Sequence, residues 1–329
     1  MRTSKSLTLS QAIEGMLFYK RAAGKSPNTI DSYRFLLDKL TLYFKNDPPF
    51  VSITRDQLIQ FFAWLRDGYK PEPSNGRGRH VEKLAPKTIL DIYGTASALW
   101  GWAVEEELAE KNLVRTIAAP KATDPVIETF TKEQLEAMLK ACDRTGIWKS
   151  RELTTNARPT ADRDRAIILL LADTGMRATE LCNIQMKDVN LNNHSIKIVG
   201  KGNKERIVFF GKRTGKALWK HLLPRLNTDQ PQDYLFAVDF PRDPRKMRRG
   251  VLMHLLKRIG ERAGVLGVHP HRYRHTFAIT YLRNGGDVLT LQALLGHADL
   301  KMVKRYAQVA ASDCARVHQA ASPVDNWRL

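Results

Sequence analysis

A segment without helical periodicity divides this 329-residue chain into two parts of different pattern. Residues 112–130 contain two prolines and show no apolar repeat at helical spacing. Proline lacks a backbone N–H donor and restricts the residue before it, so such a segment favours a linker over a helix. The sequence therefore predicts a domain at 1–120, a linker at 121–130 and a second domain at 131–329.

The first of these parts is predicted to be a bundle of helices. Thr54-Arg-Asp-Gln57 is typical of a capping box, in which two side chains satisfy free N–H groups at a helix start. Ser26-Pro27 is typical of an N-cap followed by proline in the first turn. Apolar residues then recur at helical spacing. Together these signals predict helices at about 8–21, 27–44, 54–65 and 87–110.

The second part mixes helices with a small β-sheet. Alternation at 194–199 and 206–210 predicts two strands, and the glycine-containing segment between them predicts a hairpin tip. A buried apolar run is expected at 164–173. Helices are expected from Thr131, where another capping signature stands, and at 178–186, 213–223, 246–263, 271–283 and 288–295. The predicted fold class is thus mainly α with a small β-sheet.

The net charge of +19 is concentrated in the second part. Residues 1–124 hold 18 Lys and Arg against 14 Asp and Glu, whereas residues 125–329 hold 35 against 20. A polyanionic partner such as nucleic acid is the natural interpretation, with general solubility as the alternative. We expect a cytoplasmic protein, because we find no long apolar run, no signal peptide and no paired cysteine pattern.

Two arginines are candidates for binding a phosphodiester. Arg177 follows a Thr-Gly turn, and Arg274 stands in a His-x-x-Arg pattern. A guanidinium is always charged and matches phosphate oxygens with a planar fork. Glu180 lies one helical turn after Arg177 and is placed to hold it. For either arginine alone, a surface salt bridge is the commoner role.

His271 and Lys201 are candidates for proton transfer. His271 shares a helical face with Arg274 and titrates near neutral pH. Lys201 lies between two glycines on the predicted hairpin tip, from which it can reach a groove or a leaving oxygen. Taken singly, the histidine fits a structural role and the lysine fits a solvated turn.

His297 and Tyr306 are nine residues apart, which would place them on nearly opposite faces of one straight helix. A break between them is therefore expected, with Gly296 ending one helix and Asp299 capping the next. A phenol titrates near pH 10 and needs neighbouring cations to act as a nucleophile. A tyrosine at such a position is otherwise a packing residue.

These residues in this order resemble the tyrosine recombinase (phage integrase) family, especially its Xer-like and mobile-element branch. The resemblance covers nearly the whole chain, with a helical core-binding (SAM-like) domain followed by an α/β catalytic domain. Its most specific motifs are Asp173-Thr-Gly-Met-Arg-Ala-Thr-Glu-Leu181, Gly200-Lys-Gly-Asn-Lys-Glu-Arg206, His271-Arg-Tyr-Arg-His-Thr-Phe-Ala278, and Leu294-Leu-Gly-His-Ala-Asp-Leu300 with Tyr306.

The resemblance implies a mechanism. Tyr306 attacks the scissile phosphate and forms a 3′-phosphotyrosyl link, while Lys201 protonates the leaving 5′ oxygen. The transition-state charge is stabilised by Arg177, Arg274 and His297, and His271 assists proton transfer or binds the phosphate. The covalent link keeps the bond energy, so no metal, nucleotide or other cofactor is expected.

The resemblance also implies a homo-tetramer acting on two DNA duplexes. It leaves open the target sequence, the need for accessory proteins, and whether the tail at 311–329 docks on its own or a neighbouring protomer. A type IB topoisomerase-like enzyme would share the nucleophile chemistry, and a DNA-binding regulator would lack the chemistry altogether. The complete set of six residues favours the recombinase.

Overall fold

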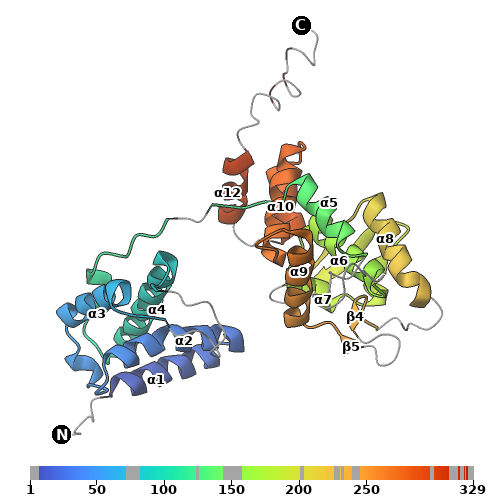
Figure 1. Ribbon diagram of the computed structural model, residues 1–329. Helices are drawn as coiled ribbons and strands as arrows, with labels where there is room; N and C mark the ends of the chain where they lie inside the picture. Colours follow the sequence, from blue (N-terminus) through green and yellow to red (C-terminus); the bar gives the residue numbers. More distant parts are fainter. Residues whose placement is uncertain are drawn as a thin grey trace, which may run out of the picture. The chain divides into compact units, whose positions relative to one another are not determined.

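The computed structural model describes residues 7–71, 82–123, 126–143, 158–200, 204–225, 230, 233–238, 245–296 and 300–310, with single positions at 318, 322 and 324. The chain forms two compact units, Met1–Val126 and Ile127–Leu329, and each is considered by itself (Figure 1). The boundary between the units lies inside the segment 121–130.

The N-terminal unit is built from helices that begin where the capping signals stand. Thr8 and Thr54 each close a capping box, with Gln11 and Gln57 respectively, and Ser26 caps the helix that starts at Pro27. The elements are α1 (Leu9–Ala22), α2 (Pro27–Tyr43), η1 (Phe50–Ser52), α3 (Arg55–Asp67), α4 (Pro86–Glu105) and η3 (Val114–Thr116).

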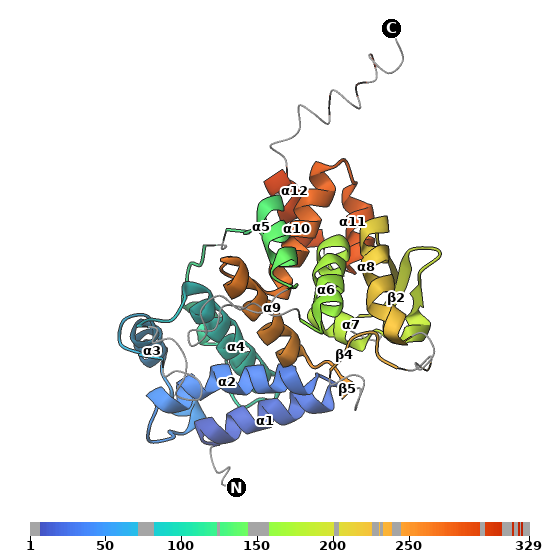
Figure 2. The same cartoon turned by 45° about the vertical axis from the view of Figure 1, so that its right-hand side comes forward.

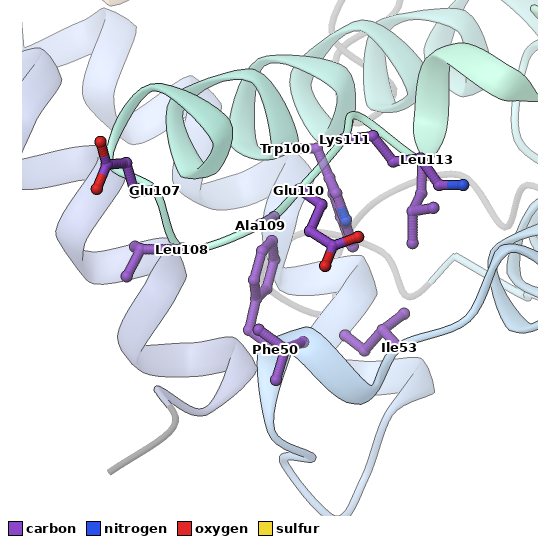
Figure 3. Close-up of a pocket in the computed structure, with 10 residues that line it drawn as sticks. Phe50, Ile53, Trp100, Glu107, Leu108, Ala109, Glu110, Lys111 and Leu113 are labelled. Carbon is purple, nitrogen blue, oxygen red and sulfur yellow. The ribbon is translucent and has the colours of Figure 1, made fainter. Parts of the chain in front are cut away.

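The core of this unit lies between α1, α2, α3 and α4, which pack on one another. Trp100 and Phe61 are among its largest fully buried side chains. An open pocket lies between η1 and the segment that follows α4, lined by Phe50 and Trp100 together with Glu107 and Glu110 (Figure 3). This pocket belongs to the N-terminal unit and contains none of the candidate catalytic residues.

In the described part of the chain, the C-terminal unit contains helices and two small sheets. Its helices are α5 (Lys132–Lys140), α6 (Ala161–Thr174), α7 (Ala178–Asn183), η4 (Met186–Asp188), α8 (Lys212–Leu222), η5 (Leu223–Arg225), α9 (Arg249–Ala263), α10 (Pro270–Arg283), α11 (Val288–Leu295) and α12 (Leu300–Ala310). One antiparallel sheet has the order β1 (Val189–Asn190), β2 (Ser195–Val199), β3 (Glu205–Phe209), and the other pairs β4 (Ala237–Val238) with β5 (Arg245–Lys246).

Helix α6 is central to the C-terminal unit because it packs against α8 on one side and α10 on another (Figure 2). Its apolar residues enter the main core together with side chains from α9 and from the β1–β3 sheet. A second, smaller cluster joins α10, α11 and α12, and Tyr306 is part of it. The candidate active site lies where these two groups of elements meet.

The mainly α fold with a small sheet is as predicted, and several boundaries differ. The helix expected at 246–263 begins at Arg249, because residues 245–246 pair with β4 instead. The helix expected to reach residue 110 ends at Glu105, and Glu107 has a positive φ of 57°, which stops a helix. Among the described residues, no helix combines the length and apolarity required to cross a membrane.

Candidate active site

The turn between α6 and α7 places Arg177. Gly175 ends α6 in the left-handed conformation, with φ of 59°, and Arg177 stands at the N-cap of α7. The contact predicted between Arg177 and Glu180 is present. The backbone N–H of Arg177 donates to Oε2 of Glu180 at 2.7 Å, and its Nη1 donates to Oε1 at 2.8 Å. The side chain of Arg177 is thereby held while remaining 29% exposed.

Glu180 also binds a second arginine, Arg206 of β3. Nη1 and Nη2 of Arg206 donate to the two carboxylate oxygens, each at 2.8 Å. Burial by itself raises the pKa of Glu180, but the hydrogen bonds and charges of Arg206 and Arg177 outweigh it and lower that pKa below its ordinary value. The buried carboxylate is therefore ionised and holds the two arginines together.

Arg206 extends this connection to the end of α11. Its Nε donates to the carbonyl of Leu294 at 2.8 Å. Gly296, which ends α11 with φ of 63°, leaves room for it, because a Cβ there would lie 2.9 Å from Nη1 of Arg206. One arginine thus joins β3, the start of α7 and the end of α11.

Arg274 is the more deeply buried of the two predicted phosphate clamps, with 3% of its surface exposed. Its Nη1 donates to the carbonyl of Gly175 at 2.8 Å and its Nη2 donates to that of Leu295 at 2.7 Å. Arg177 also reaches the end of α11, because its Nη2 donates to the carbonyl of Gly296 at 3.4 Å. Burial and the charge of Arg177 lower the pKa of Arg274 to about 10, so Arg274 stays charged at neutral pH.

His271 lies one turn before Arg274 at the start of α10. His269 caps this helix and Pro270 occupies its first turn, as the sequence indicates. The imidazole of His271 is exposed. Partial desolvation and the positive charge of Arg274 lower the pKa of this imidazole, which favours its neutral form.

Tyr306 lies on α12 with its ring packed against α10 and α11, and only 1% of its surface is exposed. Its phenol oxygen is 2.9 Å from Nδ1 of His275. Burial raises the pKa of the phenol, and this outweighs the lowering effect of Arg274, Arg305 and Arg177. The phenol is therefore protonated at neutral pH and feels the charges of both predicted clamps.

Lys201 and His297 lie outside the described residues, as do Asp299 and most of the tail 311–329. Gly200 and Gly296, the described residues that precede them, lie at the hairpin and at the helix end that the sequence predicts. Gly200 closes the β2–β3 hairpin by donating its N–H to the carbonyl of Lys204 at 2.8 Å. Gly296 ends α11 as predicted. The structure therefore brings together Arg177, Glu180, Arg274, His271 and Tyr306.

Two residues of this site had no role in the sequence interpretation, Arg206 and His275. Both stand inside motifs that were recognised, one at the end of the Gly200–Arg206 segment and the other directly after Arg274. A charged residue in a predicted strand signals only that one face is polar. Glu180, the buried partner of Arg206, is 26 residues away in the sequence, so only the tertiary structure shows that the two residues meet.

Several cationic groups thus surround the phenol. Arg177 and Arg274 present guanidinium groups at the end of α11, and both act on the charge of the Tyr306 phenol. A desolvated cluster of this kind stabilises an anion and the negative charge that develops when a phosphorus centre is attacked. The arrangement suits attack of a tyrosine on a phosphodiester.

Comparisons with known proteins identify the family that this chain is similar to. Residues 128–313 match the model of the phage integrase family. The tyrosine recombinase XerC of Staphylococcus epidermidis is 36% identical over 286 residues, covering 82% of this chain and 89% of that protein. The likeness extends over both units, because it spans more residues than the C-terminal unit contains.

Two solved structures share the fold. The XerH site-specific recombinase bound to a palindromic difH substrate has a TM-score of 0.67 at 22% identity, covering 97% of this chain and 85% of that one. A lambda integrase tetramer bound to a Holliday junction has a TM-score of 0.66 at 16% identity, covering 92% and 80%. From the family match and the relative's identity, the chain belongs to the phage integrase family and is a tyrosine recombinase, a site-specific enzyme that cleaves and rejoins DNA strands.

Proposed function

We propose that this recombinase cleaves DNA by attack of Tyr306 on the scissile phosphate. One observation carries the assignment: the phenol of Tyr306 lies among the charges of Arg274 and Arg177, which converge on the end of α11. A phosphate that bound these guanidinium groups would be next to the phenol oxygen. The product is a 3′-phosphotyrosyl link and a free 5′-hydroxyl.

The remaining residues receive roles by their chemistry and their places in the motifs. Arg177 and Arg274 bind the non-bridging oxygens, and Glu180 orients Arg177 from behind. His297 adds charge stabilisation, Lys201 protonates the leaving 5′ oxygen, and the exposed His271 contacts the phosphate. Rejoining reverses these steps when the 5′-hydroxyl of a partner strand attacks the phosphotyrosine.

The substrate is double-stranded DNA, and the working form is a homo-tetramer on two duplexes. Lambda integrase, which has a similar fold, was solved as a tetramer bound to a Holliday junction. XerH, which also has a similar fold, was solved bound to a difH substrate. The N-terminal helical unit serves as a DNA-binding domain, and the excess charge of residues 125–329 binds the phosphate backbone. The tail at 311–329 docks onto a protomer of the same assembly.

Covalent capture of DNA by the protein tests this proposal and, in the same experiment, identifies the target sequence. Random-sequence duplexes are incubated with the protein in EDTA without nucleotide, and DNA that stays attached under denaturing conditions is sequenced. A duplex of the recovered sequence, nicked close to the cleavage position so that the cut fragment diffuses away, then serves as a single-turnover substrate.

Tyr306→Phe is expected to form no covalent complex and to keep its DNA affinity, because only the nucleophilic oxygen is removed. Tyr281→Phe is the matched control, since Tyr281 packs beside the same cluster and has no proposed role in the chemistry. Cleavage by Tyr306→Phe at more than a trace level would place the nucleophile elsewhere.

A further inference from the structure

The phenol of Tyr306 is hydrogen-bonded to a histidine outside the six predicted catalytic residues. Nδ1 of His275 lies 2.9 Å from the phenol oxygen, and the two ring centroids are 5.6 Å apart with an angle of 59° between the planes. His275 follows Arg274 directly on α10, and α12 packs against α10 (Figure 2). The same helix thus brings a phosphate clamp and this imidazole to the nucleophile.

The surroundings of His275 keep its imidazole neutral. Burial is the main cause that lowers its pKa to about 4. Positive charge on Arg274 and Arg305, and on His271 or His269 when either is protonated, acts in the same direction. A neutral imidazole has one nitrogen that accepts a hydrogen bond, and a protonated phenol is a donor. The chemistry of the pair therefore assigns Nδ1 as the acceptor and the phenol O–H as the donor.

We infer that His275 is a catalytic residue of this recombinase, which takes the phenolic proton of Tyr306 at Nδ1 during cleavage and returns it during rejoining. This inference rests on the proposed role of Tyr306 as the nucleophile. The distance lies within the range that proton transfer requires of a general base. For His271 the family resemblance implies either assistance in proton transfer or phosphate binding; this histidine is exposed, and we assign it the contact with the phosphate.

Cleavage exchanges one phosphorus–oxygen bond for another. The bond from the Tyr306 oxygen to phosphorus forms and the bond from phosphorus to the 5′ oxygen breaks. The phenolic proton passes to Nδ1 of His275, and the leaving 5′ oxygen takes its electron pair and a proton from Lys201. On rejoining, the 5′-hydroxyl attacks phosphorus and returns its proton to the neutral Lys201. The bond from phosphorus to the Tyr306 oxygen breaks, and the protonated His275 gives its proton to the departing phenol oxygen.

Binding of DNA would strengthen His275 as a base when it is needed. In the free protein, Arg274 and the neighbouring histidines disfavour a proton on this ring. A phosphodiester bound to Arg177 and Arg274 introduces a negative charge beside them, which offsets that repulsion and raises the proton affinity of the imidazole. The phenol then loses its proton only when the phosphate is in place.

The hydrogen bond itself is tested without DNA. In protein labelled with ¹⁵N at histidine, the Nδ1 resonance of His275 is expected to shift when Tyr306→Phe removes the donor. The resonances of His221, which stacks on Phe236 of the main core, should not shift. An unchanged Nδ1 resonance would show that the two groups do not interact in solution.

The proton transfer is tested with two variants on the captured duplex. His275→Asn keeps a polar atom near the place of Nδ1 but cannot carry a proton, and His275→Ala leaves space for free imidazole. We expect His275→Asn to form the covalent complex at least about a hundredfold more slowly, the usual contribution of a general base. DNA affinity and the thermal midpoint should be unchanged, and added imidazole should speed His275→Ala.

Two further readouts separate a base from a residue that only supports the fold. The cleavage rate of His275→Asn should rise with pH in proportion to hydroxide, because solvent must then remove a proton from a phenol of raised pKa. A substrate with a 5′-bridging sulfur needs no proton on its leaving group, so it should rescue Lys201→Ala but not His275→Asn.

Failure of the inference and failure of the proposed function give different results. If Tyr306→Phe still forms the covalent complex, the nucleophile is another residue and the proposed function is wrong. If Tyr306→Phe is inactive and His275→Asn cleaves at the wild-type rate, Tyr306 remains the nucleophile and His275 is not its base. Rescue of His275→Asn by the sulfur substrate would also overturn the inference.

Discussion

At the scale of single residues, Glu180 organises the site because two arginines share its carboxylate. It is 2% exposed and accepts hydrogen bonds from Arg177 on one side and from both Nη atoms of Arg206 on the other. A buried charge is tolerated when it is paired and hydrogen-bonded, and it becomes costly when a partner is lost. The orientation of Arg177 therefore depends on a residue that touches no substrate.

Removing Arg206 is expected to weaken both the fold and the chemistry. Arg206→Ala leaves Glu180 with fewer partners, so the free energy of unfolding of the C-terminal unit should fall by about 3 kcal/mol. Covalent-complex formation should slow by about tenfold or more, because Arg177 is no longer held in one orientation. Chemical denaturation and single-turnover cleavage measure the two effects.

Two variants calibrate this result. Arg206→Lys keeps a charge without the planar fork and should lie between Arg206→Ala and the wild type. Lys257→Ala removes a partner of an exposed ion pair with Glu261 and should change the unfolding free energy by less than about 0.5 kcal/mol. Equal stability of Arg206→Ala and Lys257→Ala would contradict a stabilising role for the buried pair.

The lowered pKa of Glu180 also predicts how stability depends on pH. The unfolded carboxyl titrates near its ordinary value of 4.5 and the folded one below it. The stabilisation is therefore fully present above about pH 5 and is lost as the pH falls through the folded pKa. We expect the difference in unfolding free energy between wild type and Glu180→Gln to shrink below pH 4.5, measured by denaturant titration across a pH series.

The exposed Glu261 supplies the control for this series. Glu261→Gln makes the same chemical change on the surface and should alter the free energy of unfolding at neutral pH by less than about 0.5 kcal/mol, because its side chain is 59% exposed. A difference between wild type and Glu180→Gln that is as large at pH 3.5 as at pH 7 would show that the folded carboxyl has no lowered pKa.

At the scale of elements, the turn between α6 and α7 connects the main core to the site. Gly175 has φ of 59°, and its carbonyl accepts the hydrogen bond from Arg274. A Cβ at this position would lie 2.5 Å from the ring of Phe277 and 3.0 Å from the side chain of Leu295. The turn therefore requires glycine both for its backbone conformation and for the close approach of α10 and α11.

Gly175→Ala is expected to lower the unfolding free energy by about 2–4 kcal/mol, from left-handed strain together with overpacking. Cleavage should slow as well, because the carbonyl that holds Arg274 is displaced. Gly264→Ala is a matched control: Gly264 ends α9 with φ of 69°, and a Cβ there meets nothing within 4 Å. Gly264→Ala should lower the unfolding free energy by about 1 kcal/mol and leave the cleavage rate unchanged. Chemical denaturation and single-turnover cleavage are measured for both variants. Equal losses in the two variants would remove the packing argument.

At the scale of the whole molecule, the uneven charge predicts how DNA binding responds to salt. The +15 excess of residues 125–329 must displace counterions from the phosphate backbone. We expect the affinity of the Tyr306→Phe variant for a duplex to fall by at least about a hundredfold between 50 and 200 mM salt. This variant avoids covalent trapping, so equilibrium titrations report binding alone. A nearly flat plot of log affinity against log salt would exclude binding dominated by the backbone.

The sequence by itself determined the elements whose signals are local. The capping boxes at Thr54 and Thr131 start helices where they were predicted, and Gly296 ends α11 in the left-handed conformation. Each of these features depends on groups within a few residues of one another. The β4–β5 pair was missed, because strands of two residues are too short to show an alternating pattern.

Only the tertiary structure decided how the chemical groups meet. The order of the motifs predicted which residues belong together, but Tyr306 meets His275 across 31 positions and Glu180 meets Arg206 across 26. These contacts require α12 to pack on α10 and β2, the hairpin partner of β3, to pack on α7. Such packing minimises the exposed apolar surface of the whole unit. The periodicity of a single segment carries no information on the apolar surface of the whole unit. Local sequence signals therefore placed the helices, while tertiary packing selected the partners of Tyr306 and Glu180.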